Sequence, residues 1–287
     1  MIENETTASD GALVQYWVEK IAKEEKCHEP WRKAAALAEG EYYNARKDGK
    51  PVLFSLFYST TNTLHARLYS KPPVPDVRRR YDAAQKGDPM AEAGRQAATM
   101  VERALGYTID LSLFDAHAHR IVDDYLIAGA GVPWVEYEAK TSADPATGLP
   151  KIDLQRLHLK HVPWSRFHWE PGKDWEDTDW VARDFHLTAA EIKAQFGVEP
   201  ESGGTTREKG DRDKSREKYA ATYRVTEVWY KPKRTVYIIG WDFDAPLEVR
   251  QDALNLEGFF PCPRPMFANL RGDRLEPTPD YVFFQSS

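Results

Sequence analysis

One short segment carries the residue types that could bind a metal ion or move protons. Asp115, His117 and His119 occupy every second position of the sequence DAHAH. The surrounding pattern predicts a helix, on which residues two apart point about 200° away from each other. We therefore expect His117 on the face of Phe114 and Ile121, and His119 on another face, so that no single metal ion binds both rings. On a strand the two rings would share a face, so a metal site remains the alternative interpretation.

Three further histidines, His158, His161 and His168, lie in a region with strand and loop patterns. Their spacings match no tetrahedral zinc pattern and no cysteine accompanies them, so we expect them to pack and to form hydrogen bonds. A metal-dependent hydrolase that uses clustered His and Asp side chains is the alternative. The acidic segment that follows lacks the glycine of a calcium loop, because Trp180 comes directly after Asp179. We interpret this segment as a solvated turn between strands; its other acidic residues are Asp174, Glu176 and Asp177.

Two groups of basic side chains could contact phosphate or a neighbouring subunit. Arg78, Arg79 and Arg80 follow one another on a segment predicted to be extended, and 231–234 forms the tip of a predicted hairpin. Charges also keep edge strands and turns soluble, and we prefer that interpretation for the hairpin. The three arginines are therefore the basic candidates for a subunit interface or a DNA-facing surface.

Four tryptophans, Trp164, Trp169, Trp175 and Trp180, lie close together in the sequence. Aromatic rings among charges can stack on single-stranded nucleic acid, so a nucleic-acid-binding module is a second alternative function. The same rings can pack on a sheet face or at a subunit interface. The net charge of −6 favours packing, because binding of phosphates needs a concentrated basic surface. The first three are the aromatic candidates for an interface or a DNA-facing site.

Several classes of protein are disfavoured by motifs that the sequence lacks. It contains no GxxxxGK[ST] loop and no GxGxxG, GxSxG or HExxH motif, so we expect no enzyme, no cofactor and no metal. Cys27 and Cys262 are far apart, which predicts reduced thiols in a cytosolic setting, and the pair of Cys27 with His28 is a weak nucleophile candidate. The polar, acidic first ten residues do not form a signal peptide, and no apolar run reaches the ~20 residues that span a bilayer.

The two halves of the chain have different hydrophobic patterns. Residues 1–130 show helical spacing, with glycine and proline breaks between the helices. Residues 131–287 show alternating, β-branched and aromatic runs typical of strands. We predict an α+β fold with a helical N-terminal half followed by an antiparallel β-rich half, and a mobile loop near 199–219. The predicted helices are Leu13–Ile21, Trp31–Ala45, Phe54–Leu68, Pro89–Leu105, Phe114–Leu126 and Thr188–Gly197, and the predicted strands are Val132–Glu138, Ile152–Val162, Trp180–Phe185, Tyr223–Tyr230 and Thr235–Trp241.

Four groups of segments follow, in order, the pattern of one protein family. They are 31–40 with 57–73; Val122–Glu138 (VDDYLIAGAGVPWVEYE); Val162–Asp184, which begins VPWSRFHWEP; and RVTEVWYKPKRTVYII (224–239) with 256–265 and 277–281. In these segments the sequence resembles the portal, or head–tail connector, proteins of tailed double-stranded DNA bacteriophages.

This resemblance implies a structural subunit of a homo-oligomeric ring, usually of twelve subunits, at one vertex of the capsid. DNA would be packaged and ejected through the ring, and the terminase, the capsid and tail or adaptor proteins would be its partners. The protein would be assembled in the host bacterial cytoplasm and would remain in the virion. Both halves of the chain would form the wing-like portion of the subunit. The stem, clip and crown of portal proteins have no counterpart here, so we expect a partial subunit and assign no channel-lining residue.

Overall fold

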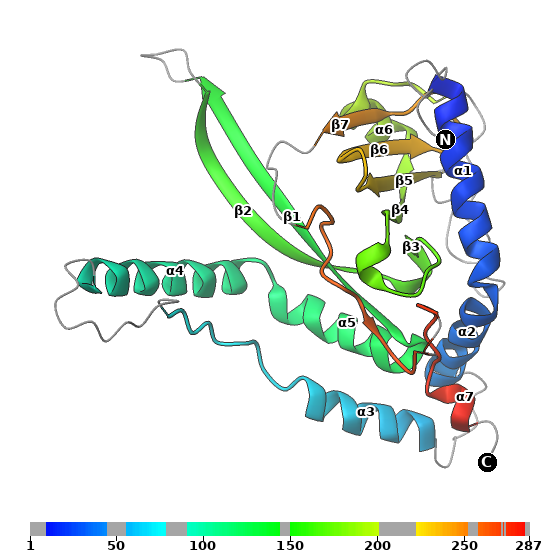
Figure 1. Cartoon of the computed structure of the whole chain (residues 1–287), viewed down its shortest axis with the longest axis horizontal. Helices are drawn as coiled ribbons and strands as arrows, with labels where there is room; N and C mark the ends of the chain where they lie inside the picture. The colour runs from blue at the N-terminus through cyan, green and yellow to red at the C-terminus, as the bar shows by residue number, and fades with distance from the viewer. Residues whose placement is uncertain are drawn as a thin grey trace.

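The N-terminal half of the chain is helical in the computed structural model (Figure 1). The structure describes residues 10–44, 56–78, 91–143, 150–200, 222–251, 258–270, 272 and 274–284. The helices of this half are α1 (Asp10–Cys27), α2 (Glu29–Asn44), α3 (Leu56–Leu68), α4 (Ala91–Leu111) and α5 (Phe114–Ala128). No helix among the described residues is both long and apolar enough to cross a bilayer.

The second half forms two antiparallel sheets. A three-stranded sheet has the order β2-β1-β8, and a five-stranded sheet has the order β3-β4-β5-β6-β7. The strands are β1 (Ala130–Ala143), β2 (Pro150–Val162), β3 (Phe167–Trp169), β4 (Trp180–Thr188), β5 (Thr222–Tyr230), β6 (Thr235–Gly240), β7 (Glu248–Gln251) and β8 (Met266–Phe267). Two 3-10 turns, η2 (Trp164–Arg166) and η3 (Trp175–Asp177), and two short helices, α6 (Ala189–Phe196) and α7 (Tyr281–Phe284), complete this half.

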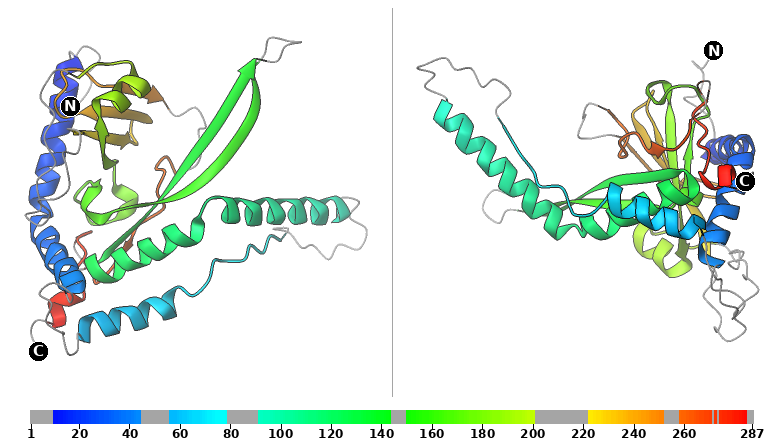
Figure 2. Two further views of the ribbon diagram at one scale, coloured as in Figure 1. Left: turned by 180° about the vertical axis from the view of Figure 1, so that it is seen from behind. Right: turned by 90° about the horizontal axis from the view of Figure 1, so that it is seen from below.

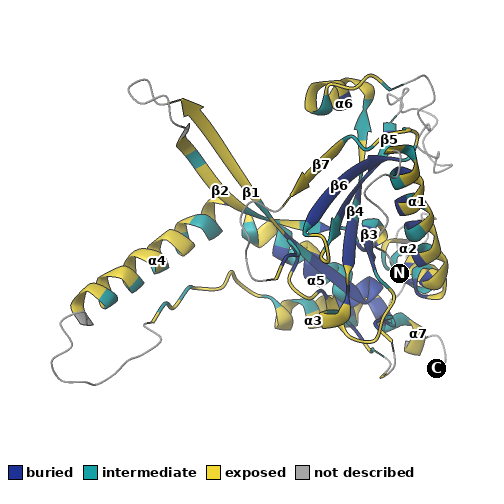
Figure 3. Cartoon of the chain, turned by 45° about the horizontal axis from the view of Figure 1, so that its top comes forward, coloured by how far each residue is buried: buried dark blue, intermediate teal, exposed yellow. Residues whose placement is uncertain are grey.

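Two long elements project from the body of the molecule in the same general direction. They are the β1–β2 hairpin and α4, and both point away from α1, α2 and the five-stranded sheet (Figures 1 and 2). The base of β1 is buried from Ala130 to Val132, whereas its outer part from Glu138 to Ala143 is exposed (Figure 3). The hairpin therefore has its core contacts at one end only.

The core lies where α1, α2 and α5 meet the sheets. On one face of the five-stranded sheet, Trp17 and Ile21 of α1 pack against Trp180, Val228 and Ile239. A second aromatic cluster joins α2 to the base of β1 and to β3; its buried tryptophans are Trp31, Trp134, Trp164 and Trp169. Burial of such large rings contributes much of the hydrophobic stabilisation of a domain.

Two backbone positions fix the course of α5 between α4 and β1. Leu113 has φ 54°, in the left-handed region that a bulky residue adopts only at a cost, and it separates α4 from α5. Gly129 ends α5 with φ 82°, and its N–H donates to Tyr125 O. A Cβ on Gly131 would lie 2.4 Å from the carbonyl oxygen of Ile121, so only glycine allows β1 to approach α5 this closely.

The predicted fold class is confirmed: helices fill the first half and antiparallel sheets the second. The predicted helices and long strands all form, with ends that differ by a few residues, and Thr188 and Glu191 form the capping box that begins α6. The sequence patterns missed β3, β7 and β8, because runs of two to four residues show no periodicity. From residue 201 on, the loop expected near 199–219 lies outside the described residues.

Candidate subunit interface

The histidines of DAHAH point to different neighbours, as their spacing on a helix predicts. The ring Nδ1 of His117 accepts a hydrogen bond from the backbone N–H of His161, at 3.3 Å. The ring of His119 stacks on His65 of α3 with 5.0 Å between the ring centroids, and its Nε2 lies 3.7 Å from Asp115. The two rings therefore do not converge on one ion.

The other predicted histidines make ion pairs and hydrogen bonds within the fold. His158 lies 3.4 Å from Glu138 across the hairpin, and His161 Nε2 lies 2.7 Å from Asp124 Oδ2. His168 on β3 differs from these two because it is buried, with only 1% of its surface exposed. This side chain lies at the centre of a buried charge network that the sequence did not predict.

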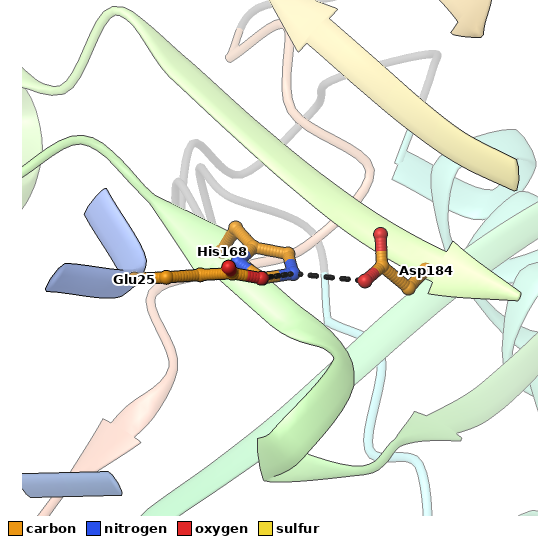
Figure 4. Close-up of side chains that lie close together, drawn as sticks. All are labelled: Glu25, His168 and Asp184. Carbon is orange, nitrogen blue, oxygen red and sulfur yellow. Dashed lines mark hydrogen bonds and ion pairs between the residues drawn. The ribbon is translucent and has the colours of Figure 1, made fainter. Parts of the chain in front are cut away.

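The buried charge network joins α1 and α2 to the face of the five-stranded sheet. Figure 4 shows Glu25, His168 and Asp184 from this network. His168 Nδ1 lies 2.7 Å from Glu24 Oε2, and its Nε2 lies 3.1 Å from Asp184 Oδ2. Two arginines donate hydrogen bonds to these carboxylates: Arg32 Nη2 donates to Glu24 at 3.1 Å, and Arg224 Nε donates to Asp184 at 2.7 Å. Its remaining members are Glu25, which accepts from Arg224 at 2.7 Å, His28, whose Nδ1 lies 2.7 Å from Glu24, and Thr226, which donates to Asp184 at 2.6 Å.

Proton affinities in this network follow from its geometry. Burial alone would raise the pKa of Glu24, but hydrogen bonds from His168 and His28 and nearby positive charge lower it to about 2. Burial likewise opposes ionisation of Asp184, yet the hydrogen bond from His168 and the charges of His168 and Arg224 lower its pKa to about 2. Burial would lower the pKa of His168, but its hydrogen bonds to Asp184 and Glu24 raise it above the ordinary 6.5. Both ring nitrogens of His168 therefore donate to carboxylates, as an imidazolium does.

A metal ion does not fit among these side chains as they lie. Glu25, His168 and Asp184 each place a ligand atom within 4.8 Å of the others. However, Arg224 Nη2 lies 2.7 Å from Glu25 Oε1 and 2.6 Å from Asp184 Oδ2, so a guanidinium already occupies the position between the two carboxylates. A cation bound there would have to displace it, and the charges of the network are already paired. The geometry is that of a structural ion network.

The predicted interface residues have different environments. Arg78 is exposed and pairs with Asp76 at 2.8 Å, while Arg79 and Arg80 lie outside the described residues. Trp164 and Trp169 are buried in the core, so the structure corrects the suggestion that their rings face DNA or another subunit. They lie in the core because α2 packs against β3 and the turns that flank it.

Trp175 of η3 is only partly buried, and it packs against Phe260 and Phe267. The acidic segment around it forms a turn between β3 and β4, as predicted. No structural observation assigns Trp175 to an interface, so its role there remains a prediction.

Large apolar side chains are exposed on the projecting elements, as they are on α2, α3 and the segment after α3. None of residues 92–111 of α4 is buried, although this helix has a well-defined apolar face. Met100 is 70% exposed and Tyr107 67% exposed. The other large exposed apolar side chains here are Val101, Leu105, Leu111 and Leu113 on and next to α4, and Val135, Tyr137, Ile152 and Leu157 on the hairpin.

A groove of about 1270 Å³ separates the hairpin from the five-stranded sheet. On the hairpin side, Trp134 and Glu136 of β1 face the sheet, whereas Val135, Tyr137 and Leu157 line the hollow from the other face of the hairpin. Tyr107 and Leu111 at the end of α4 line it as well. The other side is the sheet face opposite α1; its lining residues include Arg183, Phe185, Glu227, Trp229, Val236, Ile238 and Arg250. The buried charge network belongs to the α1 face of the sheet and does not line this groove.

Four charged side chains in the groove are paired with one another. Arg183 joins the two walls, because its Nη1 lies 2.7 Å from Glu136 of β1 and its Nε lies 2.7 Å from Glu227 of β5. Arg250 of β7 lies 2.6 Å from Glu227, and Lys160 pairs with Glu136. Burial would raise the pKa of Glu136, but Lys160 and Arg183 lower it. The groove therefore presents apolar rings together with this paired group of charges, and Arg156 and Glu248 line it as well.

Sequence patterns identified the apolar face of α4 but not its exposure. Ala97, Met100, Val101 and Ala104 recur at helical spacing within the predicted helix Pro89–Leu105, and such a face normally packs into a core. Among the described residues, no element buries this face of α4.

Residues 78–263 match the family model of the phage P22-like portal protein. Among curated proteins, none matches the chain significantly. The matched range contains α4, α5, the projecting hairpin and the five-stranded sheet, and therefore both walls of the groove. The chain belongs to the phage P22-like portal protein family, whose members are structural, ring-forming components of bacteriophage virions that connect head and tail.

Proposed function

We propose that this protein is a subunit of the portal ring at one capsid vertex, and that its ring has twelve copies. The observation that carries this proposal is the apolar surface that α4 and the hairpin expose on a projecting arm. Monomeric proteins rarely expose contiguous apolar patches beyond a few hundred Å² unless the patch binds a partner. A closed ring uses heterologous contacts, in which one surface of a subunit meets a different surface of the next.

Further features support a structural role over the two alternatives. A hydrolase needs a nucleophile or a metal-bound water in a cleft, whereas the clustered histidine and carboxylates are buried and paired with arginines. A nucleic-acid-binding module needs accessible rings, whereas Trp164 and Trp169 lie in the core. We therefore propose that the protein is not an enzyme.

In the assembled virion we propose that double-stranded DNA passes the ring without sequence-specific contacts. A net charge of −6 suits a wall past which a polyanion must slide, because a basic wall would hold it. The terminase during packaging and the tail or adaptor proteins afterwards are the proposed partners of the ring. Assembly would take place in the host cytoplasm. Arg78, on the exposed segment before α4, is the proposed basic contact to DNA or to a neighbour.

Imaging tests this proposal directly. The whole protein is purified at increasing concentration, its mass distribution is measured in solution, and the particles are viewed by negative-stain electron microscopy. We expect closed rings with a central hole and a single dominant subunit number. A population of monomers and dimers alone at the highest concentration would contradict the proposal. In a parallel titration we expect weak, salt-sensitive DNA binding; tight binding at physiological salt would favour the nucleic-acid-binding alternative.

A further inference from the structure

We infer that Arg183, together with Glu136 and Glu227, is a latch that sets the angle between the projecting β1–β2 hairpin and the five-stranded sheet. The guanidinium of Arg183 pairs with Glu136 of β1 through Nη1 and with Glu227 of β5 through Nε, each at 2.7 Å. Because a guanidinium is planar and presents its donors in a fixed fork, these two pairs fix the position of one carboxylate relative to the other. The inference does not depend on the proposed ring, since all three side chains belong to one subunit.

The latch lies where water screens its charges only weakly. The side chain of Arg183 is 18% exposed, and that of Glu227 is buried. The Cζ of Arg183 also lies 4.5 Å from the ring centroid of Trp134, which is two residues before Glu136 and therefore on the same face of β1. One cation on the sheet thus contacts β1 at two points, a carboxylate and an aromatic ring.

The base of β1 is held by the body, whereas its outer part is not. Ala130–Val132 is buried, and a Cβ on Gly131 would come within 2.4 Å of the carbonyl oxygen of Ile121. From Glu138 to Ala143 the strand is exposed (Figure 3). Arg183 contacts β1 between these two parts, so the latch acts where the hairpin leaves the body.

A contact at this position controls where the end of the hairpin lies. In the part of the chain that the structure describes, the pair of Arg183 with Glu136 is the only ion pair between the hairpin and the five-stranded sheet. At roughly 3.3 Å per residue, β1 extends about 23 Å from Glu136 to Ala143. A rotation of about 10° at Glu136 therefore moves the end of the strand by roughly 4 Å.

The latch can open without leaving a charge unpaired. Glu136 also pairs with Lys160 within the hairpin, and Glu227 also lies 2.6 Å from Arg250 within the sheet. When the hairpin separates from the sheet, Arg183 keeps Glu227 and Glu136 keeps Lys160. The large penalty of a buried ion arises when that ion loses its partner. The arrangement therefore suits a hinge that opens and closes, and not only a fixed contact.

Distances between two spin labels test the latch in the whole protein, at concentrations below ring assembly. In a Cys27→Ser background, one label is attached at Ser142→Cys on the exposed end of β1, and the other at Val249→Cys, an exposed position on β7. Cys262 is buried, so it stays unlabelled in the folded protein. We expect one narrow distance distribution in this background, because the latch holds the hairpin at one angle.

Two substitutions open the latch from opposite sides. Arg183→Met removes the cation and Glu136→Gln removes its carboxylate partner on β1, and each should widen the distance distribution at least roughly twofold. Because both remove the same contact, the double variant should be no wider than either single variant. Lys160→Met is the matched control: it removes a partner of Glu136 that lies within the hairpin, so the distribution should stay narrow.

The outcomes separate a latch from an ordinary surface ion pair. A broad distribution before substitution, an unchanged width in Arg183→Met and Glu136→Gln, or a control as wide as these variants would overturn the inference. A double variant much wider than either single variant would do the same. If Arg183→Met does not fold, Glu136→Gln decides alone, since it leaves Arg183 paired with Glu227. None of these results depends on ring formation, so the latch and the proposed ring fail or succeed separately.

Discussion

Replacement of His168 by Gln tests whether the buried charge network holds α1 and α2 on the sheet. Glutamine keeps part of the volume and one amide donor, but it removes the positive charge between Glu24 and Asp184. Removal of one partner from a buried ion pair costs about 3–5 kcal/mol, because the remaining charge stays buried without compensation. For a chain of this size, each kcal/mol lowers the melting temperature by roughly 2–4 °C, so we expect a decrease of about 10 °C.

The pH dependence of this destabilisation identifies its cause. The pKa of His168 is raised in the folded state, so its contribution is fully present below the ordinary value of 6.5 and is lost as pH rises through the folded pKa. The pKa values of Glu24 and Asp184 are lowered to about 2, so their contributions are present above the ordinary values of 4.5 and 3.8 and are lost as pH falls towards 2. The difference between wild type and His168→Gln should therefore be largest between about pH 5 and 6 and should shrink at alkaline pH.

Denaturant unfolding of wild type and variant across pH 5 to 10 measures this difference, at protein concentrations below ring assembly. His158→Gln is the matched control, because that ring forms a partly exposed pair with Glu138 and should cost less than about 1 kcal/mol. A destabilisation by His168→Gln that is equal at pH 6 and pH 10 would show that the ring acts by packing and not by charge. A cost as small as that of the control would refute the network argument altogether.

Three further outcomes follow from the structure. Gly131→Ala should destabilise the fold by about 1–3 kcal/mol, since its Cβ would overlap Ile121 O, whereas Gly172→Ala, with its nearest contact at 3.9 Å, should change the melting temperature by little. Native protein should show one reactive thiol with a disulfide reagent, from exposed Cys27, and a second from Cys262 only after denaturation. Prolonged treatment with EDTA should leave the melting temperature unchanged, because an arginine fills the space between the carboxylates of the buried network; a shift of several degrees would reveal a bound metal.

Local patterns in the sequence were sufficient to predict most elements of the fold. The helix stop at Gly129, the capping box at Thr188 and Glu191, and the alternation of Val132–Glu138 each act within a few residues of the element they define. For the same reason the angle of 200° between residues two apart on a helix separated His117 from His119 correctly. These signals do not depend on which segments meet in space.

The buried network and the exposed arm could not be predicted, because both depend on long-range arrangement. Glu24 and His168 are separated by 144 positions in the sequence, and nothing near either residue indicates the other. The apolar face of α4 has the same spacing as a core helix, and only the fold shows that it lies in solvent. Likewise, the sequence favours packing of the tryptophans near β3, but only the fold shows that α2 covers them.

The buried charge network and the exposed apolar side chains of α4 and the hairpin have different effects on this subunit. Glu24, Glu25 and Asp184 are paired with Arg32, Arg224 and the imidazolium of His168. The hydrogen bonds of this network are directional, and they hold α1 in one position on the sheet, which apolar contact alone specifies less strictly. The exposed apolar side chains of α4 and the hairpin contribute no such stabilisation within a single subunit, because they stay in contact with water. Because the network and the arm lie on opposite sides of the five-stranded sheet, substitutions in the network should change stability without altering the contact between subunits. Substitutions on α4 should alter assembly at constant stability.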